Sequence, residues 1–434
     1  MEPARPLTLA HATALVVASM VGTGVFTTTG FMLADLHSPM LALGVWVLAG
    51  ALALAGAAVY AELGAMMPRA GGEYVYLTRA FHPAVGFLSG WVSLLVGFAA
   101  PTAAAALAFG RYAQTLVPAL PVKTVALALV AAATLLHLRD VRRGGVMQAL
   151  LTGLVIALIV GFIVVALASG RADWMRIARP QAAAVGSEPG IGAVGVSLVY
   201  VAYSYFGWNA AAYVAGEIRD PDRTLPRALL GGTALVTVLY VALNAVFLSS
   251  APAAELAGKV EIAHVAATAL LGSKGGVVVS ALVALALAGS VSALTMTGPR
   301  VVQAMAQDGQ FFRALGRTGA GGAPTAAVLL QGALAAAGIL TAAFEPLLVY
   351  AGFTLTLSAA ATVAGAFVLR RREPAAARPH RALAWPVSGI AYLSLAAFMT
   401  VFAIRERPTE SLAGIATLLA GTLAWLVWQR RRRR

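Results

Sequence analysis

Long apolar stretches repeat along the whole chain and are separated by short polar connections. Each stretch reaches the ~20 residues that a helix needs to cross the hydrocarbon core of a bilayer. This pattern predicts an all-α polytopic membrane protein with twelve transmembrane helices. The predicted spans are 8–34, 39–66, 83–110, 122–138, 146–169, 190–217, 226–249, 276–306, 324–343, 346–369, 383–404 and 411–429.

The connections between the predicted spans are too short to hold a soluble domain. The longest are 171–189 and 251–275. The second contains an apolar segment, Ala253 to Leu271, that fits a short helix on the outer surface. We therefore expect the protein to act within the membrane.

Composition and charge agree with a membrane protein. Only 11% of the residues are charged, whereas soluble domains carry about 25%. The net charge of +14 does not indicate nucleic acid binding, because no Lys/Arg patch is interleaved with aromatic residues. With a cytoplasmic N-terminus, most basic residues fall on the inner side of twelve spans, which predicts that both termini are cytoplasmic. The final run, Arg430–Arg434, is expected to contact anionic lipid.

Two spans are interrupted by glycine near their middles. The first contains Gly22-Thr23-Gly24, and the sixth contains Phe206-Gly207. Glycine destabilises a helix by about 1 kcal/mol relative to alanine, although a lone glycine often serves only close helix packing. Because the two interrupted spans are five apart in order, they predict two inverted five-helix repeats, each opening with a broken helix.

A broken helix in a membrane offers polar main-chain groups to a ligand. Each unsatisfied amide or carbonyl in hydrocarbon costs several kcal/mol, so a break must be buried in protein or line a wet cavity. The half-helix after a break presents free amides and a positive dipole end that favour an anion. The carbonyls before the break favour an ammonium group. A zwitterionic amino acid supplies both charges.

Four stretches resemble the amino acid–polyamine–organocation superfamily of transporters, near its neutral amino acid permeases and exchangers. They are Gly22–Phe26, Tyr60–Tyr76, Phe206–Ala228 and Gly298–Gly309. The resemblance covers essentially the whole chain. It implies a LeuT-like fold with inverted repeats at 1–170 and 190–370, peripheral spans and a basic tail at 382–434, and alternating access around a site at mid-membrane.

The resemblance also implies roles for individual residues. The substrate carboxylate would meet the amides of Gly22, Thr23 and Gly24, and the ammonium would meet the carbonyls of Met20, Tyr203 and Phe206. Pocket and gate residues would be Ser19, Tyr203, Ser204 and Gly207. Tyr203 fits an ordinary interfacial tyrosine equally well. Leucine at Gly24 is expected to fill the space where a carboxylate must approach.

Charges suggest a neutral substrate and an inner gate. We find no Asp, Lys or Arg within the bundle, and a permease for charged side chains would be expected to hold a partner there. An inner gate network is predicted from Glu62, Glu217, Arg219 and Arg223. The arginines would also lie inside simply under the positive-inside rule.

The driving ion stays open at this point. Many relatives carry a lysine in the fifth span, where this chain has Val155. A sodium ion would need oxygen ligands, and Ser290 and Ser292 are candidates for these. Small hydroxyl residues at such positions more often serve helix packing. Proton coupling by another route, sodium coupling and exchange for a counter-substrate all remain possible.

Other functions fit the chain less well. A channel is disfavoured because there is no carbonyl-ring signature and no ring of acidic residues. An enzyme is disfavoured because His11, His137 and His264 lack a partner carboxylate or a second histidine at metal spacing. We expect no cofactor, no metal and no catalytic residue. A carrier for a polyamine or another amine is the remaining alternative within the superfamily.

Overall fold

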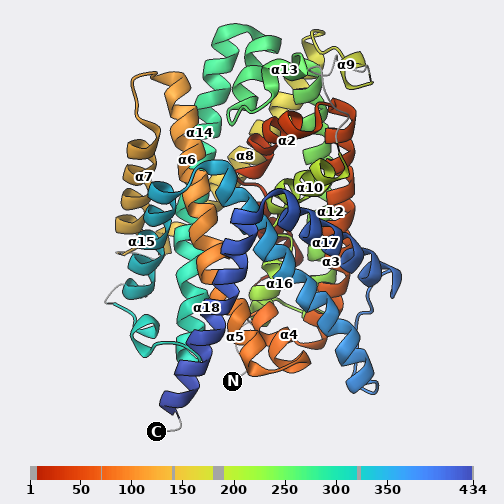
Figure 1. The fold of residues 1–434 in the computed structure, drawn as a ribbon, viewed down its shortest axis with the longest axis vertical. Helices are drawn as coiled ribbons and strands as arrows, with labels where there is room; N and C mark the ends of the chain where they lie inside the picture. Colours follow the sequence, from red (N-terminus) through yellow and green to blue (C-terminus); the bar gives the residue numbers. More distant parts are fainter. Residues whose placement is uncertain (1–6, 70, 139–141, 179–189, 320–323, 433–434) are drawn as a thin grey trace.

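The computed structural model describes residues 7–69, 71–138, 142–178, 190–319 and 324–432 (Figure 1). These residues are nearly all helical, and the one extended pairing among them is a bridge between Leu7 and Ile218. The helices are α1 (Leu9–Met20), η1 (Gly24–Phe26), α2 (Thr28–Leu36), α3 (Pro39–Met66), α4 (Glu73–Ala80), α5 (Pro83–Val92), η2 (Ser93–Ala99), α6 (Ala100–Leu116), α7 (Val122–His137), α8 (Arg142–Ala168), α9 (Met175–Ala178), α10 (Ile191–Tyr205), α11 (Ala210–Tyr213), η3 (Ala215–Glu217), α12 (Pro221–Ser250), α13 (Ala253–Leu256), α14 (Ile262–Gln307), η4 (Arg313–Gly316), α15 (Thr325–Thr341), α16 (Phe344–Arg372), α17 (Val387–Glu406) and α18 (Pro408–Arg432).

The predicted class, an all-α polytopic membrane protein, is confirmed. Among the described residues, seven helices are long and apolar enough to cross a membrane, and five shorter apolar helices occupy the other predicted spans. Span 1 is divided into α1, η1 and α2, and span 6 into α10, α11 and η3, whereas α5, the π-helical η2 and α6 run on as one span. The last two residues of the basic run, 433–434, lie outside the described residues, as does the loop at 179–189.

Local sequence signals set where several helices begin. Pro39 and Pro83 each stand in the first turn of a long helix, where their missing amide hydrogens cost nothing. The preceding residues, Ser38 and His82, accept hydrogen bonds from the main-chain amides of the first turn.

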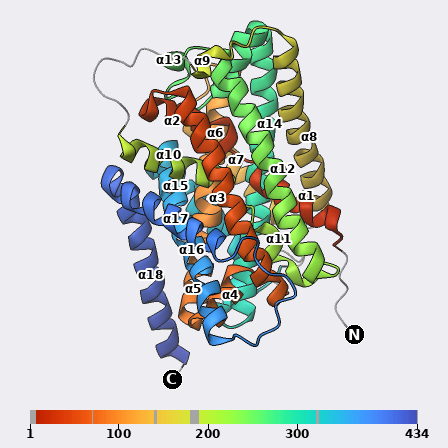
Figure 2. The ribbon, with the colours of Figure 1, turned by 90° about the vertical axis from the view of Figure 1, so that its right-hand side faces the viewer.

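The predicted surface segment between spans 7 and 8 is helical in two pieces. The short α13 is followed by the first part of α14, which bends at Gly272, where φ is +80°. A positive φ of this size suits glycine because it has no Cβ. Both views place α13 at one end of the bundle and α4 at the other (Figures 1 and 2).

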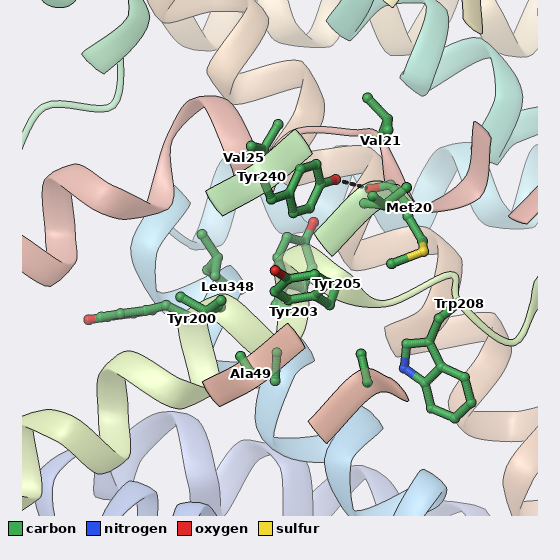
Figure 3. Packing of buried hydrophobic residues seen from close by; sticks show 14 of the residues in the cluster. Met20, Val21, Val25, Ala49, Tyr200, Tyr203, Tyr205, Trp208, Tyr240 and Leu348 are labelled. Carbon is green, nitrogen blue, oxygen red and sulfur yellow. Dashed lines mark hydrogen bonds between the residues drawn. The ribbon is translucent and has the colours of Figure 1, made fainter. Parts of the chain in front are cut away.

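Aromatic side chains from three helices form the part of the core that holds the two breaks. The ring of Tyr240 in α12 lies 5.2 Å from that of Tyr205 in α10, between centroids (Figure 3). It also lies 5.5 Å from the ring of Trp46 in α3. The indole N–H of Trp46 donates to the hydroxyl of Thr29 in α2. This buried cluster ties both halves of the first span to the helix that leads into the second break.

Candidate functional site

The first break leaves main-chain amides without partners. α1 ends at Met20, and the chain is not helical again until the single turn of η1. Within the part of the chain that the structure describes, no acceptor takes the amides of Thr23, Gly24 or Val25. These donors begin the half-span that contains α2, where the helix dipole favours an anion.

The carbonyl groups of the same turn are already occupied. The hydroxyl of Thr27 donates to the carbonyl of Thr23 at 2.9 Å, and that of Thr28 donates to the carbonyl of Gly24 at 2.8 Å. Thr28 also contacts the hydroxyl of Ser204 across the two breaks, at 3.2 Å. The first break therefore offers donors rather than acceptors on its α2 side.

Tyr240 is a polar contact of the first break that the sequence did not reveal. Its hydroxyl donates to the carbonyl of Met20 at 2.6 Å and interacts with the backbone of Gly22 (Figure 3). The carbonyl of Met20 was predicted to meet a substrate ammonium, so it would do so beside the phenol of Tyr240. The one tyrosine of the seventh predicted span was the only available signal.

The second break contributes carbonyl groups without donors. α10 ends at Tyr205, and Gly207 turns the chain with φ at +109° before α11 begins. The carbonyl of Tyr203 accepts the Phe206 amide of its own turn at 3.1 Å. Among the described residues, no donor reaches the carbonyl of Phe206.

The two breaks touch each other, and glycine makes this contact possible. A Cβ added at Gly207 would lie 2.4 Å from the carbonyl oxygen of Ser19. One added at Gly24 would lie 2.5 Å from the Cα of Ser204, whereas one added at Gly22 would meet only a carbonyl oxygen at 3.9 Å. A leucine at Gly24 would therefore collide with α10, and the approach of a carboxylate to Gly24 stays a prediction. Gly24 makes room for α10, and the open space lies at Gly22.

One side of the breaks lies at the surface of the protein. Ser19 is exposed, and Gly22 and Phe206 are partly exposed. On the other side, Val25 is fully buried and Tyr203 is 8% exposed. The predicted gate residue Tyr203 thus lies on the sealed side of the breaks.

An ion cluster closes the region beside α2. Arg407, between α17 and α18, lies 2.8 Å from a carboxylate oxygen of Glu345 and 3.4 Å from one of Asp35. Its guanidinium also donates to the hydroxyl of Tyr200, which donates to Glu345 at 2.6 Å. We call these four residues the Arg407 cluster. The sequence did not predict it, because Asp35 and Arg407 fall just outside the predicted spans.

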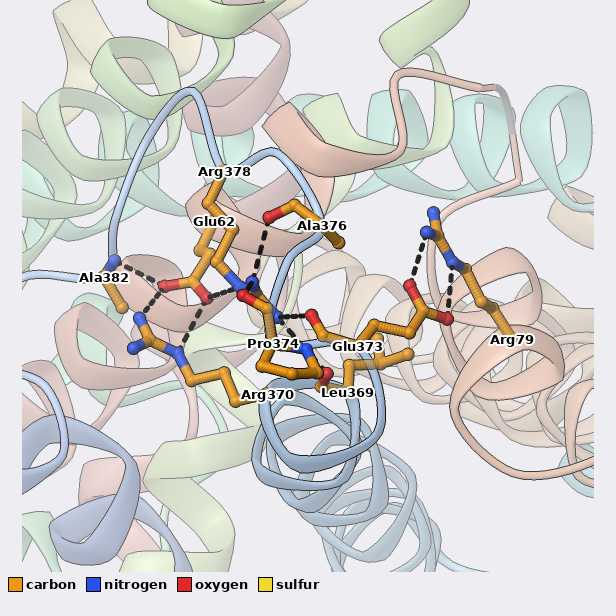
Figure 4. Close-up of polar contacts among 9 residues, drawn as sticks. All are labelled: Glu62, Arg79, Leu369, Arg370, Glu373, Pro374, Ala376, Arg378 and Ala382. Carbon is orange, nitrogen blue, oxygen red and sulfur yellow. Dashed lines mark hydrogen bonds and ion pairs between the residues drawn. The ribbon is translucent and has the colours of Figure 1, made fainter.

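A second ion cluster closes the region beside α4. Glu62, only 2% exposed, receives a two-pronged contact from Arg370 and lies 3.4 Å from Arg378. The amide of Ala382 donates to the same carboxylate at 2.8 Å (Figure 4). We call Glu62, Arg370, Arg378 and Ala382 the Glu62 cluster. It anchors the loop after α16 over the end of α3.

The predicted inner network is replaced by this cluster. Glu217, Arg219 and Arg223 are exposed, and no ion pair joins them to Glu62 within the described residues. The main chain at Glu217 and Arg219 instead pairs with Leu7, just before α1. Glu62 finds its arginines on and after the tenth span because that helix ends beside α3.

A family model described as amino acid permease matches residues 7–425. The chain belongs to this family. The "Large neutral amino acids transporter small subunit 2" of Rattus norvegicus is 31% identical, with 97% of this chain and 80% of the relative covered, and the Homo sapiens protein of that name has the same values. The "Asc-type amino acid transporter 1" of Mus musculus is 28% identical, with 95% and 79% covered.

In this permease, the two hydroxyl groups that were predicted to bind sodium have hydrogen-bond partners within the protein. Ser290 donates to a carbonyl of its own helix at 3.2 Å. Ser292 contacts a ring nitrogen of His137 at 2.9 Å. A sodium role for these serines stays a prediction. Val155, at the expected lysine position, is 6% exposed in an apolar setting.

Proposed function

We propose that this permease carries a small neutral amino acid across the cytoplasmic membrane by alternating access, without chemical change to it. The supporting observation is the pair of touching breaks, which offers the unpartnered amides of Thr23, Gly24 and Val25 beside the unpartnered carbonyl of Phe206. A carboxylate and an ammonium on one carbon need such donors and acceptors a few ångströms apart.

The polar contacts at the breaks support a neutral side chain. They consist of main-chain groups and hydroxyl groups, such as those of Thr28, Ser204 and Tyr240. The Arg407 and Glu62 clusters instead involve opposite ends of α16. A charged substrate side chain would need a buried counter-charge. The names of the relatives, which include large neutral amino acids, agree with this proposal.

The two clusters support a pair of gates. The Arg407 cluster joins α2 and α10, which follow and precede the breaks, to α16. The Glu62 cluster joins α3 to the loop after α16. We assign the α4 end to the cytoplasm, because it carries the arginines at the end of α16 and the basic end of α18. The inverted repeats at 1–170 and 190–370 are part of this proposal.

Uptake into proteoliposomes tests the function. A panel of amino acids and one polyamine is offered with no gradient, with a sodium gradient, with a pH gradient and with internal substrate. We expect uptake of neutral amino acids and none of the polyamine. The condition that stimulates uptake identifies sodium coupling, proton coupling or exchange. If no amino acid of the panel is taken up under any condition, the proposal is contradicted.

Two glycine variants place the site. Gly22→Leu fills the open space at the first break, and Gly44→Leu changes a glycine of α3 with no heavy atom within 4 Å of its added Cβ. We expect Gly22→Leu to insert normally and to lose more than about tenfold of transport, the effect of removing roughly 1.4 kcal/mol of binding. Gly44→Leu should transport like the unchanged protein. Equal transport by both variants contradicts the site.

A further inference from the structure

Glu73 is a buried carboxylate at a meeting point of five elements. It is the first residue of α4, outside the candidate spans, and is 5% exposed. One oxygen, Oε1, accepts from the hydroxyl of Tyr60 at 2.6 Å and from the amide of Asn209 at 3.0 Å. The other, Oε2, accepts from Ser358 at 2.9 Å and Ser89 at 3.4 Å. The donors come from α3, the second break, α16 and α5.

The groups around Glu73 are neutral. The titratable side chains that face it are those of four tyrosines, from α3, α4, α11 and α17: Tyr60, Tyr76, Tyr213 and Tyr392. No ion pair involves Glu73 in the described part of the chain, whereas Glu62 has two arginines. Neither the gates nor the break contacts described above use Glu73, so its retention at a buried position needs another account.

The hydrogen bonds to Glu73 favour its charged form, against the effect of burial. Burial raises the pKa of the carboxyl group, and the bonds from Tyr60, Ser358, Ser89 and Asn209 oppose that rise. The positive end of the α4 dipole also favours the charged form. The charged form therefore depends on neutral donors, each of which can be lost without leaving a partner charge behind.

The two oxygens differ in their ability to take a proton. A hydroxyl group can donate or accept a hydrogen bond, so the hydroxyl of Ser89 or Ser358 can turn and accept a hydrogen bond from a protonated Oε2. The N–H of Asn209 can only donate, so a proton on Oε1 would face another donor. Protonation at Oε2 requires no movement of the backbone.

One of the four donors lies on a part that must move. Asn209 belongs to the second break, directly before α11. Alternating access requires the half-helices on the two sides of a break to change their positions relative to the scaffold. A shift of the second break away from α4 takes the Asn209 donor from Oε1. The charged form then loses stabilisation while Glu73 remains buried.

We propose that the carboxyl group of Glu73 is a proton-binding site whose occupancy follows the position of the second break, so that substrate movement is coupled to a proton. This inference rests on the transport function proposed above. The step forms one O–H bond at Oε2 with a proton from hydronium on the side opposite α4, leaving water; when Asn209 returns, that O–H bond breaks and the proton passes to water on the α4 side. Because occupancy and conformation are linked, a pH difference across the membrane biases the transport cycle.

Accumulation of substrate under a pH gradient tests the proposal. In proteoliposomes with the α4 side facing the alkaline compartment, a gradient of one pH unit supports about tenfold accumulation of a neutral substrate at one proton per cycle. Glu73→Gln keeps the acceptor at Oε1 but cannot titrate. We expect this variant to lose accumulation and to retain exchange of external for internal substrate. The exposed Glu255→Gln should behave like the unchanged protein.

Two further measurements keep the test decisive if Glu73→Gln does not fold. Glu73→Asp retains a titratable group and is expected to keep part of the accumulation. Substrate added to the unchanged protein in weakly buffered detergent should change the bulk pH, read with a dye. No pH change and no accumulation, alongside intact exchange, overturns the proton site but leaves amino acid transport standing. Absence of exchange as well contradicts the transport function itself.

Discussion

Gly207 lies against the main chain of Ser19, so that the second break rests directly on the end of α1. A Cβ at Gly207 would come 2.4 Å from the Ser19 carbonyl oxygen, and the residue has φ at +109°. Both the contact and the dihedral angle require glycine. At this contact the two halves of the proposed site meet main chain to main chain, with no side chain between them.

Gly207→Ala tests this contact. The added methyl group must push α1 away from the second break, and the strained dihedral costs about 1–3 kcal/mol. We expect a lower thermal midpoint and a loss of exchange of more than about tenfold. Gly231→Ala, in α12 with no atom within 4 Å of the added Cβ, is the matched control. Normal exchange by Gly207→Ala would show that the breaks need not touch.

Tyr240→Phe separates a structural from a binding role of the phenol. Removing the hydroxyl leaves the Met20 carbonyl without its 2.6 Å bond, at a cost of about 1 kcal/mol in stability. The control is Tyr205→Phe, whose hydroxyl donates to the carbonyl of Trp46 at 3.2 Å. We expect similar thermal destabilisation of both variants and a changed substrate Kd only for Tyr240→Phe, measured by isothermal titration calorimetry.

Much of the fold and part of the site follow from the sequence. The spans follow because a bilayer demands long apolar helices, and the breaks follow because two glycine-rich interruptions recur five spans apart. The partners of Glu62 do not follow, because a pairing with Arg370 across 308 positions depends on how helices pack. The close contact between Gly24 and Ser204 of α10 does not follow either, because the sequence does not show which neighbour lies where the Cβ is missing.

Arg407→Gln should loosen the region beside α2. Asp35 and Glu345 would lose their counter-charge, and because the three side chains are 26–30% exposed, we expect a loss of about 1 kcal/mol or less in global stability. Hydrogen exchange should rise in α2, measured by mass spectrometry. Arg405→Gln, which changes a neighbouring arginine without an ion pair in the described structure, should leave α2 unaffected. Unchanged exchange in the first variant argues against a gate.

The ion pair of Arg79 and Glu373 should contribute a small amount to the free energy of unfolding, and this contribution should fall at acidic pH. The hydrogen bond from Arg79 holds the pKa of the Glu373 carboxyl below its ordinary value of 4.5. The folded state therefore gains stability above that value and loses it as the pH falls further, by about 1 kcal/mol at most because both side chains are at least a third exposed. Glu373→Gln should lower the thermal midpoint at pH 7 and have less effect at pH 3.5.

That comparison has its own control. Glu255→Gln changes an exposed glutamate of α13, so its effect should not follow the same profile. An equal effect of Glu373→Gln at both pH values would mean that the pair contributes nothing as an ion pair.

The tenth span takes part in the Arg407 cluster, the Glu73 site and the Glu62 cluster. Glu345 stands at the beginning of α16, Ser358 at its middle and Arg370 near its end. At 1.5 Å per residue its 29 residues measure about 44 Å. Such a helix can pivot about its contact with the Glu73 carboxyl group. The same tilt then strains the bonds of the Arg407 cluster at one end while it relaxes those of the Glu62 cluster at the other.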